Sequence, residues 1–120
     1  MKWEKVKKFV NLTPHELAFW IKNPDGSEKI IRVPKGDSIV RLDNRCEYAG
    51  SALGIPVVCC KEGKPHNLPA PEEGVVYLVS SLVAKKVLRD DVLCPDTSDD
   101  GAIRDGNGVI IAVKRLQNFR

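Results

Sequence analysis

Turn-forming residues divide this 120-residue chain into segments that are too short for long helices. Asn23–Gly26, Pro34–Asp37 and Asp105–Gly108 each combine two or more of the residues Asn, Asp, Gly and Pro, which favour tight turns. The segment Lys61–Gly74 contains Pro65, Pro69 and Pro71 and is therefore expected to be a loop or extended connector. A chain interrupted in this way is expected to form short strands joined by turns.

Alternation of apolar and polar residues predicts the strands of the N-terminal half. Phe9–Leu12 is expected to form the first strand. Thr13–Glu16 has the form of a helix capping box. The alternation in Leu17–Lys22 and the return segment Ile30–Val33 nevertheless favour a hairpin preceded by one tight turn. Ser38–Leu42 alternates in the same way and predicts a further strand.

The C-terminal half contains the most regular pattern. Val75–Val79 is β-branched and aromatic, which is typical of a buried central strand. Ser81–Leu88 follows it as the one expected helix, Asp91–Leu93 as a short strand, and Ala102–Arg104 with Val109–Lys114 as a hairpin. The pattern predicts an α+β, strand-dominated fold in a single domain over residues 1–120. We expect a small antiparallel or mixed β-sheet or barrel with one helix in the C-terminal half.

Charge and hydropathy disfavour several classes of function. The 19 Lys and Arg against 16 Asp and Glu give a net charge of +3, which is too mild for a dedicated duplex-DNA binder. The basic segment from Lys2 to Lys8 is expected to be a solvated terminus. No apolar stretch is long enough to span a bilayer, and no signal-peptide pattern is present. We therefore expect a cytoplasmic protein without a membrane or nucleic-acid partner.

The four cysteines are expected to be free, reduced thiols, because no secretory signal accompanies them. Cys59 and Cys60 stand in the apolar run Gly54–Cys60, which predicts a buried strand with both residues as small core side chains. Cys46 and Cys94 complete the set. Neither the cysteines nor the two histidines have zinc-ligand spacing, so we expect no metal site and no cofactor.

Phosphate binding is the strongest chemical hypothesis. A strand that runs into Ser80 and Ser81 at the start of a helix leaves free N–H groups at the positive end of the helix dipole. Arg89 and Arg104 follow as candidate guanidinium anchors. The plainer alternatives are a helix cap for the serines and ion pairs with neighbouring aspartates for the arginines. The predicted ligand-binding residues are Asn11, Thr13, His15, Ser80, Ser81, Arg89, Asp96, Thr97 and Arg104.

A hydrolase is the alternative hypothesis. His15 would act as the base, with Asp96 or another acidic residue positioning water or a metal ion. The serines lack a G-x-S-x-G motif, and adjacent acids in the loop Cys94–Gly101 are typically solvated or cap the following element. A third hypothesis is a protein that binds and inhibits a host enzyme.

Three blocks of sequence resemble a known family. They are VNLTPHE at residues 10–16, LPAPEEGVVYLVSSLVA at residues 68–84, and the closing RDDV, PD and AIRD segments. The pattern is similar to that of a widespread family of small, largely uncharacterised prokaryotic and prophage proteins, over nearly the whole chain. The resemblance implies a non-enzymatic, phage-type binding protein. By analogy of genomic context, it suggests an anti-defence sponge that sequesters a phosphate-bearing nucleotide signal, with a homo-oligomer interface as one location for the site.

Overall fold

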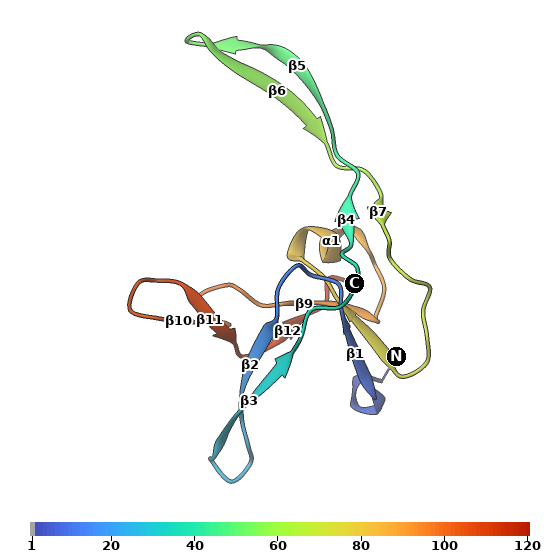
Figure 1. Ribbon diagram of the computed structural model, residues 1–120, viewed down its shortest axis with the longest axis vertical. Coiled ribbons are helices and arrows are strands. Elements are labelled where there is room, and N and C mark those ends of the chain that lie inside the picture. The colour runs from blue at the N-terminus through green and yellow to red at the C-terminus, as the bar shows by residue number, and fades with distance from the viewer. Residues whose placement is uncertain (1) are drawn as a thin grey trace.

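The computed structural model describes residues 2–120 and has an α+β architecture dominated by strands. Over this range there is one α-helix, in the C-terminal half, and the sheets are small and mixed (Figure 1). The predicted fold class is therefore confirmed, with open sheets rather than a closed barrel among these residues. The expectation of one domain stays a prediction.

Two four-stranded sheets form the body of the molecule, with strand orders β1-β8-β9-β12 and β10-β11-β2-β3. Two further strand pairs, β4 with β7 and β5 with β6, complete the β-structure of residues 2–120. In chain order the elements are η1 (Trp3–Lys5), β1 (Lys8–Asn11), β2 (Leu17–Lys22), β3 (Glu28–Val33), β4 (Arg41–Leu42), β5 (Arg45–Ala52), β6 (Ile55–Lys61), β7 (Pro65–His66), β8 (Val75–Leu78), α1 (Ser81–Lys86), β9 (Val92–Pro95), β10 (Ala102–Arg104), β11 (Ile110–Val113) and β12 (Leu116–Gln117).

Strand β8 lies in the middle of the first sheet, between β1 and β9, and the segment it begins is buried on both faces. Val75, Tyr77 and Val79 belong to the core cluster that includes the buried residues of α1. Val76 and Leu78 belong to a second cluster, shared with the β10-β11-β2-β3 sheet. Successive strand residues point to opposite faces, so a continuous apolar run fits a strand that is covered on both sides. The predicted buried central strand is confirmed.

Helix α1 begins where predicted and ends earlier. Ser80 is its N-cap, and the Ser80 side chain accepts a hydrogen bond from the backbone N–H of Val83 at 3.5 Å. Val87 already has extended backbone, with φ −109° and ψ 110°, so the helix ends at Lys86 and the expected end at Leu88 is wrong. Leu88 lies beyond the helix and is 66% exposed. No helix in residues 2–120 is long and apolar enough to cross a membrane.

The other predicted hairpins are present. Strand β2 pairs with β3 in antiparallel register after a short bend at residues 13–15, so the hairpin interpretation is confirmed over the capping-box helix. Strands β10 and β11 form the hairpin expected around Asp105–Gly108. In Ser38–Leu42 only β4 pairs as a strand, although Val40 is buried in the core.

Strands β5 and β6 form a two-stranded hairpin that projects away from the body (Figure 1). We call residues 45–61 the arm. Every residue of β6 is exposed, so the expectations of a buried strand at Gly54–Cys60 and of a core position for Cys59 and Cys60 are wrong. Apolar composition predicted burial, but no other element of residues 2–120 pairs with these strands.

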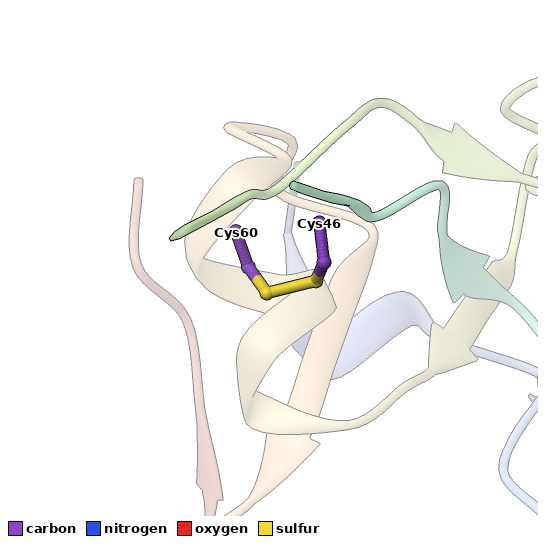
Figure 2. The surroundings of a disulfide bond; sticks show 2 residues. All are labelled: Cys46 and Cys60. Atoms are coloured by element: carbon purple, nitrogen blue, oxygen red, sulfur yellow. A yellow bond between two sulfur atoms is a disulfide. The ribbon is translucent and has the colours of Figure 1, made fainter. Parts of the chain in front are cut away.

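A disulfide bond joins Cys46 and Cys60 near the base of the arm (Figure 2). The expectation of four free thiols is therefore wrong for this pair, whereas Cys59 and Cys94 are free. The antiparallel register places Cys46 directly opposite Cys60. The two residues are 14 positions apart in the sequence, so the sequence alone does not show that they are neighbours. Cys94 is buried, and desolvation raises the pKa of its thiol to about 11, with the charge of Asp96 acting in the same direction.

Candidate functional site

The residues predicted to bind a ligand lie in separate places on the body. Thr13 and Ser80 line one pocket of about 310 Å³, together with Arg41. Arg89 lines a different pocket of about 660 Å³. Arg104 is exposed on β10, the edge strand of the second sheet (Figure 1). The structure thus joins the serine with Thr13 and separates it from both predicted arginine anchors.

Asn11, Thr13 and His15 are joined in one hydrogen-bond network. The Asn11 side-chain amide donates to the carbonyls of His15 at 2.8 Å and Val33 at 3.1 Å. Its oxygen accepts from the Thr13 hydroxyl at 2.6 Å and from the Thr13 backbone N–H at 3.0 Å. Asn11 and Thr13 are buried, whereas His15 is exposed and enters the network through its backbone. These contacts fix the link between β1 and β2.

The start of α1 offers little to an anion. The helix has only six residues, so few peptide dipoles add along its axis. The Ser80 hydroxyl is already the N-cap, which is the plainer alternative for this residue and is confirmed. Ser81 lies within the helix and is half-buried.

Arg89 holds several segments together. Its guanidinium forms two hydrogen bonds to the Asp91 carboxylate, at 2.9 and 2.7 Å, and a third to the carbonyl of Pro69 at 3.1 Å. It also lies over the ring of Tyr77, 6.0 Å from the centroid. Asp91 is buried, and its hydrogen bond is the main cause that raises the pKa of Arg89. The ion-pair alternative for Arg89 is confirmed.

We predict opposite effects for the two arginines. Arg89→Ala leaves the buried Asp91 carboxylate without its partner and is expected to lower the free energy of unfolding by about 1–3 kcal/mol. Arg104 donates to the carbonyl of Gly108 at 2.8 Å on an exposed turn, and not to Asp105 as the ion-pair alternative has it. Arg104→Ala is therefore expected to change the free energy of unfolding by less than about 0.5 kcal/mol. Urea unfolding of both variants measures this; equal effects would contradict it.

Asp96 is a fully buried carboxylate with its partners in place. It accepts hydrogen bonds from the Ser98 hydroxyl at 2.6 Å, from the Ser98 backbone N–H at 3.0 Å and from the Arg115 guanidinium. The Ser98 hydroxyl and then Arg115 hold the pKa of Asp96 at about 2. Of the two alternatives for the acids of this loop, solvation is wrong for Asp96, which instead accepts from the backbone N–H of the following Ser98. Thr97, the other predicted ligand-binding residue of this loop, is exposed. In the hydrolase hypothesis Asp96 would position water or a metal ion, but its carboxylate is buried and already bonded to Ser98 and Arg115.

Asp96 also predicts how stability depends on pH. Its pKa is about 2 in the folded chain against an ordinary value of 3.8, so the folded state favours the ionised form. The stabilisation is therefore complete above the ordinary pKa and is lost as the pH falls through the folded one. Thermal unfolding from pH 6 to about pH 2 is expected to bring the melting temperatures of the intact chain and Asp96→Asn closer together. A constant difference across this range would contradict the prediction.

The arm is an exposed apolar surface that our sequence interpretation missed. No charged residue lies between Glu47 and Lys61. Leu53 at the tip is 103% exposed, Tyr48 is 71% exposed and Ile55 is 67% exposed. The long uncharged run was visible in the sequence, but we interpreted its second half, Gly54–Cys60, as core. Large contiguous apolar surfaces on soluble domains typically mark interaction sites.

Both faces of the arm are apolar. Residues directly opposite each other in an antiparallel pair share a face, which places Tyr48 with Val58. Val57 precedes Val58 in β6 and therefore points to the other face. Val57 and Val58 are 41% and 54% exposed, so neither face is covered by the chain itself.

The tip of the arm holds a leucine in an unfavourable backbone conformation. Leu53 and Gly54 form the two-residue turn between β5 and β6, with φ of 48° and 79°. Hairpin turns with two positive φ angles prefer Asn-Gly or Asp-Gly, because a bulky side chain is strained there. The fully exposed Leu53 therefore has a backbone conformation that is unfavourable for leucine. Unfavourable backbone conformations are common at functional sites.

The residues described here include no group of three or more His, Cys, Asp or Glu side chains that would hold a metal ion. No family model, curated protein or solved structure matches the chain. The family resemblance of the sequence blocks therefore stays a prediction. The arm and the two pockets are the features on which a function can be argued.

Proposed function

We propose that the protein is a non-enzymatic binding protein whose recognition element is the arm, and that the arm docks on an apolar protein surface. The observation that carries this proposal is the projecting hairpin, which is apolar on both faces and carries no charge between Glu47 and Lys61. An isolated two-stranded ribbon is only marginally stable in water. A partner that covers its faces would supply the burial that the chain itself does not.

The arm is held in a defined shape before it meets a partner. The Cys46–Cys60 disulfide closes the hairpin near its base. A cross-link that closes a loop of about 15 residues lowers the conformational entropy of the unfolded loop, which stabilises the folded state by about 3 kcal/mol. Pre-ordering of this kind lowers the entropy cost of docking, because the strands are already paired before contact.

A protein surface suits the arm better than a lipid bilayer does. Strands β5 and β6 pair only with each other, so the outer edge of each carries backbone N–H and C=O groups without a strand partner. Such groups find no hydrogen-bond partner inside lipid, which excludes open sheet edges from the hydrocarbon region. A protein surface and its bound water can satisfy them.

Photo-cross-linking in producing cells tests the proposal. A photoreactive phenylalanine analogue replaces Tyr48 in the arm or, as the control, the exposed Leu88 at the end of the helix. We expect a discrete protein adduct from position 48 that Leu53→Asn abolishes, and none from position 88. The proposal would be overturned if position 48 formed no adduct in the chain that keeps Leu53, or if position 88 formed an equal adduct. Co-sedimentation with phosphatidylcholine–phosphatidylglycerol vesicles that requires Leu53 would also overturn it, because the partner would then be lipid.

Capture of a phosphate-bearing nucleotide signal, with the anti-defence role implied by the resemblance, is a second candidate function. One observation favours it: Arg41 borders the 310 Å³ pocket with Thr13 and Ser80, and its guanidinium has no ion-pair partner within residues 2–120. A guanidinium that is not held in an ion pair is a suitable phosphate ligand. This candidate places the anchor at Arg41 instead of Arg89 or Arg104.

Thermal-shift measurements test the second candidate. Cyclic dinucleotides, cyclic trinucleotides and cyclic ADP-ribose isomers are each added to the intact chain and to Arg41→Ala. A ligand at 100 times its Kd stabilises the folded state by about 2.7 kcal/mol, so a true ligand raises the melting temperature of the intact chain alone. No shift with any of them, or an equal shift in Arg41→Ala, would reject this site.

A further inference from the structure

We propose that the partner of the arm is a second copy of this chain, and that two copies exchange their arms. This inference rests on the proposed function, because it names the occupant of the same surface. Three observations carry it: the surface that one copy leaves exposed, the charge of the two contacting surfaces, and the two uncovered faces of the arm.

The exposed area of one copy matches the requirement of a stable dimer. A compact monomer of 13.3 kDa exposes about 6,450 Å². This chain exposes 8646 Å², an excess of about 2,200 Å² over the compact value. Obligate homodimers bury about 1,000–2,500 Å² on each subunit. The excess therefore has the size of one subunit's share of an obligate interface.

The dimensions of the molecule point the same way. The radius of gyration is 17.2 Å, whereas a compact domain of this length has a radius of about 13.6 Å. The principal extents of 59 × 39 × 26 Å reflect the projecting arm (Figure 1). A single copy is thus an open shape with an appendage, and the exchange of such an element between copies is a low-cost route to dimers.

Charge also favours contact through the arm. Two copies of net charge +3 repel each other over most approaches. The stretch between Glu47 and Lys61 carries no charge, so two arms meet, or an arm meets a body, without bringing like charges together. The body offers apolar residues in return, with Ile30 on β3 48% exposed and Ile111 on β11 51% exposed.

Reciprocal exchange covers both faces of the arm. If one face contacts the arm of the partner copy and the other contacts its body, the sides marked by Val57 and Val58 are both removed from water. Edge pairing is less suitable, since β6 carries Pro56, which has no N–H, and β5 is bulged between Tyr48 and Gly50. We therefore assign the contact to the faces and the tip of the arm.

Sedimentation velocity of the purified intact chain, with its disulfide formed, tests the inference over a wide concentration range. We expect a species of twice 13.3 kDa. Leu53→Asn creates the Asn-Gly pair that two-residue turns prefer, so it keeps the hairpin and removes only the apolar tip. We expect it to weaken association by about tenfold or more, and Val58→Thr to do so through one face. Leu88→Asn is the matched control and should leave association unchanged.

The outcomes separate this inference from the proposed function. A monomer at every concentration, with a Tyr48 adduct to a different protein in cells, would overturn self-association and leave the arm as the binding element. Association that survives Leu53→Asn and Val58→Thr would place the interface elsewhere and overturn the inference. A monomer that also forms no Tyr48 adduct would overturn both. Circular dichroism and intact mass of the disulfide-bonded variants confirm that each compared chain is folded.

Discussion

Leu78→Ala is expected to lower the free energy of unfolding by about 2–5 kcal/mol, because it opens a cavity in the most enclosed part of the fold. Leu78 is 0% exposed and lies in the cluster between β8 and the second sheet. Its neighbours Phe19 and Val113 belong to strands held by their own hydrogen-bond ladders, so they have little freedom to collapse into the space. For a domain of this size such a loss is a large part of the total stability.

The matched control is Leu82→Ala, the same change on helix α1 at a side chain that is 58% exposed. We expect it to change stability by less than about 0.5 kcal/mol, since it opens no cavity and alanine is a good helix former. Chemical unfolding of both variants measures the difference. Equal small effects would mean that β8 is not buried between two layers, and the fold described here would be wrong.

Asn11→Ala is expected to lower the free energy of unfolding by about 2–4 kcal/mol, because it leaves several buried polar groups without hydrogen-bond partners. The variant removes the donors to the carbonyls of His15 and Val33 and the acceptor for both donors of Thr13. Asn11 is 2% exposed, so water cannot readily replace these contacts. The prediction is a loss of stability rather than a loss of ligand binding by a stable protein.

Asn107→Ala is the control, because Asn107 is an exposed asparagine in the β10–β11 turn. It is expected to change stability by less than about 0.5 kcal/mol. Thermal unfolding compares the two variants in parallel. An Asn11→Ala protein as stable as the control would show that the amide is dispensable to the fold, and would favour its predicted role as a ligand-binding residue.

The sequence predicted the elements whose pattern also determines their burial. The apolar run at residues 75–79 is long, β-branched and followed by a serine cap, and each of these signals is local. The hairpins at β2–β3 and β10–β11 follow from turn residues that act within a few positions. The predicted end of α1 at Leu88 was wrong, because the backbone is already extended at Val87. Helix periodicity alone does not show where the helical backbone ends.

Of the two strands of the arm, only β6 was predicted, as the buried strand Gly54–Cys60, and its burial was wrong for a physical reason. Hydrophobicity indicates that residues 54–60 prefer to leave water, but it does not indicate which molecule will cover them. Burial within one chain requires a facing element, and residues 2–120 provide none for β5 and β6. The disulfide was missed for a related reason: Cys46 and Cys60 become neighbours only through the hairpin register.

The candidate site was predicted only in part. The plainer alternatives for Ser80 and Arg89, a cap and an ion pair, were visible from neighbouring residues and are confirmed. The partners of Asp96 and Asn11 lie up to 22 residues away along the chain and depend on how the strands assemble. Side chains of this kind look equally suitable for a ligand or for the protein itself until the fold is known.

Hydrogen–deuterium exchange of the arm amides tests the central claim most directly, because it reports on residues 48–60 themselves. A free two-stranded ribbon exchanges quickly, whereas a docked one is protected. We predict protection of residues 48–60 in the intact chain at high concentration, its loss on dilution, and its absence at both concentrations in Leu53→Asn. Fast exchange of the arm at every concentration, with the β8 amides protected throughout, would contradict docking of the arm on a second copy of this chain.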